Sequence, residues 1–174
     1  MNRNIIVFVA TTLFFIAVRT TDAQQAIFLV RHGETVAPKG TDARPLSEAG
    51  HRRAVLLATL LKDAGIKAIF TSDLERTIKF AEPLAQALRI ESKPLAQIGV
   101  QFKPNDVEAF FVDLLRREHR NDVVLIVGHS NSVPALLKAL GYPVKVKIPE
   151  TEFDNLFVVT PKTEGPPTVL RLHY

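Results

Sequence analysis

Apolar and polar positions alternate along the chain with two different periods. Short, nearly continuous apolar runs bounded by polar residues or glycine are typical of buried strands. Between these runs, apolar residues recur every three or four positions, which is typical of helices that cover a sheet. The runs predict strands at 26–30, 68–71, 123–127, 157–159 and 169–172.

Four helices are predicted between these strands. Ser47 caps the first, Asn105 caps the third, and the fourth begins near Ser132 and stops at Gly141. The first has an apolar stripe and ends at Gly65, and the second has an apolar face and an internal proline, Pro83, which is expected to kink it. The apolar stripe of the first helix is Ala54, Leu57, Leu60, Leu61 and Ala64. The apolar face of the second helix is Ile78, Ala81, Leu84 and Leu88. The apolar face of the third helix is Val107, Phe110, Phe111, Leu114 and Leu115.

The order of the elements predicts an α/β fold. Strands that alternate with helices favour a three-layer architecture, with a mostly parallel sheet and helices on both of its faces. The last two strands flank a turn at 161–167 and predict a C-terminal hairpin, while residues 91–104 are expected to be irregular. Residues 24–174 are therefore expected to form a single domain.

The first 23 residues have the pattern of a secretory signal peptide. A short basic start precedes an uncharged, mostly apolar run at 5–18, and small residues at Thr21 and Ala23 suit a signal peptidase. The alternative is a membrane anchor, but this run is shorter than the roughly 20 residues that a spanning helix needs. We expect cleavage, no stable membrane anchor afterwards, and a periplasmic or secreted protein.

Charge and composition exclude several classes of function. The formal net charge is +4, and no run of lysine and arginine marks a nucleic-acid surface. The chain has no cysteine, which excludes cysteine-based phosphatase chemistry and thiolate metal sites. No metal-ligand spacing is present, so neither a metal nor another cofactor is expected.

Charged and imidazole side chains follow three of the predicted strands. Arg31 and His32 follow the first strand, Arg76 lies shortly after the second, and His129 follows the third. Open α/β sheets bind ligands at the carboxyl ends of their strands. Two histidines and two arginines at these ends indicate a pocket for a phosphate dianion.

The motifs around these residues resemble those of the histidine phosphatase superfamily, which has the phosphoglycerate mutase-like fold. They are Arg-His-Gly-Glu-Thr at 31–35, Pro-Leu-Ser-x-x-Gly at 45–50, Ser-x-Leu-x-Arg-Thr at 72–77 and Gly-His at 128–129. The resemblance implies a phosphatase in which His32 is the nucleophile. It also implies that Arg31, Arg76 and His129 line the phosphate pocket.

The residue types suit that chemistry. A neutral imidazole can attack phosphorus and form a phosphohistidine that water then hydrolyses. The flanking arginines are expected to lower the pKa of His32 and keep it neutral. The forked donors of Arg31 and Arg76 match phosphate oxygens and the charge that develops on them.

The proton donor to the leaving group is less well defined. Many superfamily members supply a glutamate between the arginine motif and the second histidine, and Asp106 and Glu108 fall in that interval. We assign the role to Asp106, with Glu108 second and with Glu152 and Asp154 as further candidates. Asp106 and Glu108 also suit a purely structural role in the first turn of a helix.

The sequence therefore predicts an exported phosphatase that acts on small phosphomonoesters or phosphoproteins. A mutase is a weaker hypothesis, because it needs a phosphorylated cofactor to prime the histidine. A serine hydrolase would use Ser130, which lies between a strand and a helix as in a nucleophile elbow, but Ser132 replaces the final glycine of that motif. A binding module for phosphate or phosphoproteins without enzymatic activity is the third alternative.

Overall fold

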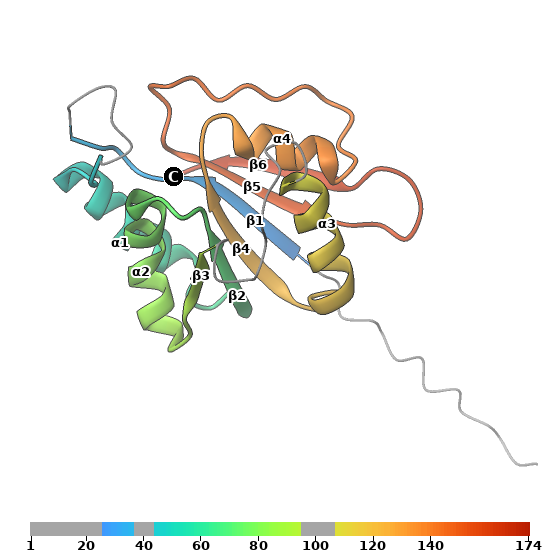
Figure 1. The fold of residues 1–174 in the computed structure, drawn as a ribbon, viewed down its shortest axis with the longest axis horizontal. Helices are drawn as coiled ribbons and strands as arrows, with labels where there is room; N and C mark the ends of the chain where they lie inside the picture. The colour runs from blue at the N-terminus through green and yellow to red at the C-terminus, as the bar shows by residue number, and fades with distance from the viewer. Residues whose placement is uncertain (1–25, 37–43, 95–106) are drawn as a thin grey trace, which may run out of the picture.

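The computed structural model describes residues 26–36, 44–94 and 107–174 (Figure 1). The predicted signal peptide, the predicted cap Asn105 and the candidate acid Asp106 lie outside these residues. The helices are α1 (Glu48–Leu61), α2 (Glu75–Leu88), α3 (Val107–Glu118) and α4 (Ser132–Ala139). The strands are β1 (Ala26–Arg31), β2 (Ile66–Thr71), β3 (Ser92–Pro94), β4 (Val123–Gly128), β5 (Asn155–Thr160) and β6 (Thr168–His173).

The strands form one mixed sheet in the order β3-β2-β4-β1-β5-β6. The first four strands in this order run parallel, whereas β5 pairs antiparallel with β1 and β6 pairs antiparallel with β5. The predicted α/β class, the mostly parallel sheet and the C-terminal hairpin are therefore confirmed.

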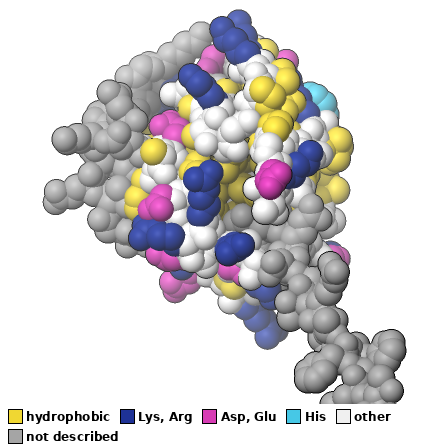
Figure 2. Space-filling model, turned by 90° about the vertical axis from the view of Figure 1, so that its right-hand side faces the viewer, with side chains coloured by type: hydrophobic (Ala, Val, Ile, Leu, Met, Phe, Trp, Pro, Cys, Tyr) yellow, Lys and Arg dark blue, Asp and Glu magenta, His cyan; other side chains and the backbone are white. Residues whose placement is uncertain are grey.

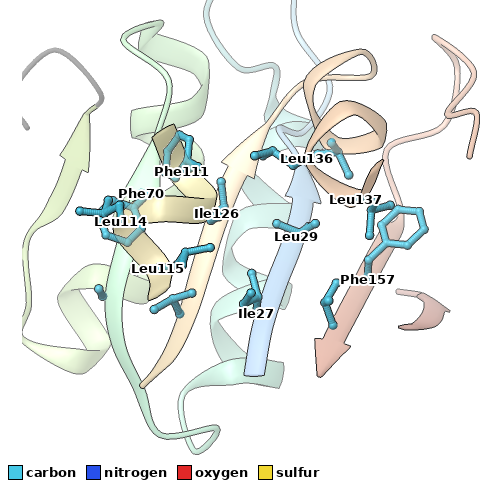
Figure 3. Close-up of a cluster of buried hydrophobic side chains, with 14 of the residues drawn as sticks. Ile27, Leu29, Phe70, Phe111, Leu114, Leu115, Ile126, Leu136, Leu137 and Phe157 are labelled. Carbon is cyan, nitrogen blue, oxygen red and sulfur yellow. The ribbon is translucent and has the colours of Figure 1, made fainter. Parts of the chain in front are cut away.

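Two hydrophobic clusters lie on opposite faces of this sheet. Successive side chains of a strand point to opposite faces, so Ile27 and Leu29 enter one cluster and Val30 enters the other. The first cluster includes α3 and α4, whose side chains pack against the strands in Figure 3. The second includes α1 and α2, which lie on the other side of the sheet in Figure 1.

The helices differ in detail from the sequence prediction. Helix α1 ends at Leu61, and Gly65 (φ +73°) lies in the turn that follows. Leu60, which was predicted to face the core, is 52% exposed, so this assignment is wrong. Helix α2 runs through Pro83 from Glu75 to Leu88. No helix in the described part of the chain is long and apolar enough to cross a membrane.

The segment at 91–104 was predicted to be irregular, but it contains the short strand β3, which pairs parallel with β2. Its three residues include Lys93 and Pro94, so it has no apolar pattern to read. A proline is tolerated here because β3 is an edge strand of the sheet.

Candidate active site

The parallel strands bring the predicted site residues to one edge of the sheet. Arg31 is opposite Gly128 in the register of β1 and β4, and the backbone N–H of His32 donates to the carbonyl of Gly128 over 3.0 Å. The residues that follow these two strands therefore lie side by side. The rings of His32 and His129 are 5.2 Å apart, edge to face.

The imidazole of His32 is held in one orientation by hydrogen bonds at both nitrogens. Its Nδ1 lies 2.7 Å from the carbonyl oxygen of Gly33, and Arg76 Nε donates to its Nε2 over 3.2 Å. A carbonyl only accepts, so the partners assign the proton to Nδ1 and leave the lone pair on Nε2. This lone pair points toward the guanidinium of Arg76, where a phosphate would be bound.

The surroundings of His32 favour its neutral form. Burial lowers the pKa of His32 to about 4, and the positive charges of His129, Arg76 and Arg31 add to this effect. The hydrogen bond to the Gly33 carbonyl opposes it. At neutral pH the imidazole is neutral, with its Nε2 lone pair available, and can act as a nucleophile.

Arg31 is buried and holds the loop that leads into β5. Its Nη1 donates to the carbonyls of Pro149 and Glu152, each over 2.9 Å, and its Nη2 donates to a Glu150 oxygen over 2.7 Å. The guanidinium carbon also lies 4.1 Å from the centre of the Phe153 ring. Arg31 therefore positions this loop against the histidines.

Arg76 and His129 are positioned by α2 and the turn before it. Arg76 is 7% exposed in the first turn of α2, where the helix dipole disfavours a cation. His129 Nε2 lies 2.9 Å from the hydroxyl of Ser72, which also bonds Thr77 over 2.9 Å. The hydroxyl of Ser72 thus links the turn after β2 to the histidine after β4.

Glu150 is a site residue that the sequence analysis missed. One carboxylate oxygen accepts from Arg31, and the other accepts from the hydroxyl of Ser130. The Ser130 hydrogen bond and the charge of Arg31 lower the pKa of Glu150 against the effect of partial burial. Glu150 follows an irregular segment, so no spacing rule could have connected it with Arg31.

Two glycines allow the loop after β1 to pack closely. A Cβ on Gly33 would lie 2.8 Å from the Gly50 Cα and 2.8 Å from the Phe80 ring, and a Cβ on Gly50 would lie 2.2 Å from the Glu34 carbonyl oxygen. The Arg-His-Gly and Pro-Leu-Ser-x-x-Gly motifs therefore meet at a backbone contact. This contact fixes the loop that carries His32 on the first turn of α1.

Four of the five predicted site residues come together: His32, Arg31, Arg76 and His129. Asp106, the predicted proton donor, lies outside the described residues. Among the other acid candidates, Glu108 lies in the first turn of α3. Glu152 pairs with Arg171, and Asp154 pairs with His173, so both of these carboxylates have partners on β6.

Three further arginines, Arg44, Arg52 and Arg53, differ in their surroundings. Arg52 is exposed and pairs with Glu48. Arg53 is largely buried in a 2.7 Å ion pair with Glu34, and this hydrogen bond lowers the pKa of Glu34. Burial lowers the pKa of Arg31, and the nearby positive charge of Arg44 lowers it further. It therefore adds positive charge beside the site.

A separate hollow of about 800 Å³ lies at the amino ends of the parallel strands. It is lined by apolar side chains such as Ile27 and Leu115 and by three cations, Arg116, Arg120 and Lys162. Figure 2 shows the side of the molecule that faces right in Figure 1, on which Lys and Arg side chains lie among Asp and Glu side chains and areas of hydrophobic surface. Of the predicted site residues that the structure describes, His32, Arg31, Arg76 and His129, none lines this hollow.

Comparison with known proteins confirms the predicted resemblance. Residues 27–98 match the sequence model of the histidine phosphatase superfamily (branch 1). A "probable phosphoglycerate mutase", GpmB, from Proteus mirabilis is 46% identical over 70 residues, which are 37% of this chain and 33% of that protein. The GpmB of Yersinia enterocolitica is 41% identical over 75 residues, 39% of this chain and 35% of that protein. The matches thus span about a third of these relatives.

Solved structures share the fold over most of the chain. The protein histidine phosphatase SixA in complex with tungstate superposes with a TM-score of 0.63, covering 85% of this chain and 96% of SixA at 21% identity. A phosphoserine phosphatase from Entamoeba histolytica superposes with a TM-score of 0.59, covering 83% of this chain and 94% of that protein at 16% identity. The α/β fold of the chain is therefore that of histidine phosphatases.

Proposed function

Because residues 27–98 match the sequence model of the histidine phosphatase superfamily, we propose that this chain hydrolyses phosphomonoesters through a phosphohistidine on His32. The observation that carries the proposal is the orientation of the His32 ring. Its unprotonated Nε2 faces the Arg76 guanidinium over 3.2 Å, and the Gly33 carbonyl holds the opposite nitrogen. A nucleophile and a phosphate-binding cation thus meet at one point.

The surrounding charges support phosphoryl transfer in two steps. In the first step His32 Nε2 attacks phosphorus while Arg76, Arg31 and His129 stabilise the charge on the phosphoryl oxygens. In the second step water attacks the phosphohistidine, which releases phosphate and restores the neutral imidazole. The substrates we propose are small phosphomonoesters or phosphorylated proteins. SixA and the phosphoserine phosphatase, whose fold the chain shares, are named for phosphorylated substrates of these kinds.

Hydrolysis is favoured over the two other enzymatic hypotheses. A mutase, as the GpmB relatives are named, requires a phosphorylated cofactor to prime the histidine. A serine hydrolase of the Ser-His-Asp type has a histidine base on its nucleophile, whereas the Ser130 hydroxyl donates to Glu150 and His129 Nε2 bonds Ser72.

The test is turnover of a phosphomonoester panel by residues 24–174, with vanadate as inhibitor. His32→Ala should abolish turnover, and the wild type should carry phosphate on His32 after an alkaline quench. His51→Ala, which removes an exposed histidine on α1, is the matched control and should keep full activity. Full activity in His32→Ala would refute the mechanism. Binding of vanadate without turnover of any substrate would support the binding-module alternative.

We also propose that the protein is exported and acts in the periplasm or outside the cell. The support is the signal-peptide pattern of the first 23 residues. Substrates would then be phosphorylated compounds or proteins available in that compartment.

A further inference from the structure

Cleavage of an alkyl phosphate leaves an alkoxide, which needs a proton as it departs. If this chain has the proposed function, one of its own side chains can supply that proton. A donor must be an acidic group beside the bound phosphate that can reach the leaving oxygen, and a carboxyl group can serve. The position of Glu150 meets this requirement through two direct contacts.

Glu150 lies where the site meets solvent. Its side chain is 79% exposed, whereas that of Arg31, its ion-pair partner over 2.7 Å, is 5% exposed. The carboxylate therefore bridges the buried cation and the solvent. A phosphate bound by the buried cations would have its ester oxygen directed outward, toward the side on which Glu150 lies.

The backbone on both sides of Glu150 is fixed by the same cation. Arg31 donates to the carbonyls of Pro149 and Glu152, and the Phe153 ring packs on its guanidinium. Ser130, next to His129, holds the second carboxylate oxygen. The carboxylate thus has a defined position relative to the imidazole that attacks phosphorus.

We propose that Glu150 is the proton donor of the reaction. As His32 Nε2 forms its bond to phosphorus, the bond to the ester oxygen breaks, and the Glu150 carboxyl gives its proton to that oxygen. The products of this step are the free alcohol, a phosphohistidine and the Glu150 carboxylate. In the second step the carboxylate takes a proton from the attacking water, the phosphorus–nitrogen bond breaks, and phosphate, neutral His32 and protonated Glu150 result.

The bound substrate supplies the conditions for this role. Without substrate, Arg31 and Ser130 stabilise the ionised carboxylate. A phosphoryl group on Arg31 competes for that cation and adds negative charge beside Glu150, and both changes raise the affinity of the carboxylate for a proton. A substrate that binds as its monoanion brings the proton, because the second ionisation of a phosphate ester has a pKa of about 6.

The inference is tested by the leaving-group dependence of Glu150→Gln. The quantity to measure is kcat/KM, which reports the phosphorylation step, for an alkyl phosphate and for 4-nitrophenyl phosphate. Glu150→Gln should lower kcat/KM for the alkyl ester by about 10²–10⁴-fold and for the aryl ester by less than about tenfold, because nitrophenolate departs without protonation. Glu150→Asp should recover part of the alkyl activity. With the aryl ester, Glu150→Gln should accumulate phosphohistidine, since the second step has lost its base.

Glu164→Gln is the matched control, because it removes one exposed negative charge in the β5–β6 turn. It should leave both substrates unaffected. Equal losses on both esters in Glu150→Gln would overturn the inference and assign Glu150 a positioning role through Arg31. Tighter vanadate binding with an unchanged alkyl-to-aryl ratio would also overturn it, since Glu150 would then only compete with phosphate for Arg31. In either case wild-type turnover leaves the proposed function intact, whereas a wild type inactive on both esters would overturn both.

Discussion

His32 links the proposed chemistry to the stability of the fold. The residue is 7% exposed, and burial with nearby positive charge lowers the pKa of its imidazole to about 4. In the unfolded chain the same imidazole has a pKa near 6.5. Between these two values the unfolded state binds more protons than the folded state, so acid favours unfolding.

The free energy of unfolding should therefore fall as the pH drops from 6.5 toward 4, and the contribution of His32 should be complete above 6.5. A shift from 6.5 to about 4 corresponds to a change of up to about 3 kcal/mol. Urea unfolding of the wild type and of His32→Asn at pH 4.5 and pH 7 measures it. The carboxylates titrate in both proteins, so the wild type should lose more stability than the variant. Equal losses would show that His32 is not held neutral by the fold.

At the scale of single residues, the sequence was sufficient to predict site residues that lie at the ends of strands. Arg31, His32 and His129 could be predicted because they follow strands, and parallel strands end at one edge of a sheet. Glu150 could not be predicted, because its contact with Arg31 spans 119 positions and depends on the path of an irregular segment. The Glu34–Arg53 pair could not be predicted for a similar reason, because it forms only when the loop after β1 packs on α1.

At the scale of single elements, α1 shows how far an apolar period can be read. The sequence placed Leu57 and Leu60 on the same stripe, but Leu57 is fully buried and Leu60 is 52% exposed. The buried face is centred on Ala54, Leu57, Ala58 and Leu61. Leu60 lies about 60° from Leu57 around the helix axis, on the side away from Ala58 and Leu61, and is therefore outside the buried face.

These two leucines form a matched pair for mutation. Leu57→Ala should lower the free energy of unfolding by about 2–5 kcal/mol, because it leaves a cavity in the cluster between α1, α2 and the sheet. Leu60→Ala should change it by less than about 0.5 kcal/mol, as expected for a surface position. Chemical denaturation of both variants provides the comparison. Similar losses in both would mean that α1 is rotated relative to the orientation described above.

Strand β3 is too short to be predicted from the pattern of apolar and polar residues. Its three residues pair with β2 through the backbone, so their side chains carry no periodic signal. The longer strands and all four helices were predicted because each buries enough apolar surface to impose a period of two or of three to four. Element ends were less accurate, as at Leu61, because they depend on local hydrogen bonds.

At the scale of the whole molecule, the described fold begins with β1 at Ala26, three residues after the predicted cleavage site. If the signal-peptide prediction is right, intact-mass measurement of protein purified from its native cells should give the mass of residues 24–174. Removal of 23 residues should not change activity on soluble phosphomonoesters, because β1, which delivers Arg31 and His32, begins at Ala26. A mass that retains Met1 to Ala23 would contradict export by cleavage.

The central place of β1 in the sheet also determines the order in which backbone amides exchange with solvent deuterium. Strand β1 lies between β4 and β5, whereas β3 and β6 lie at the two edges. Edge strands exchange through local fraying, but the amides of β1 are released only when neighbouring strands separate, which approaches global unfolding. The pair Arg31–His32 at the end of β1 should therefore stay assembled through most local opening events, while the hairpin edge at β6 opens and closes many times.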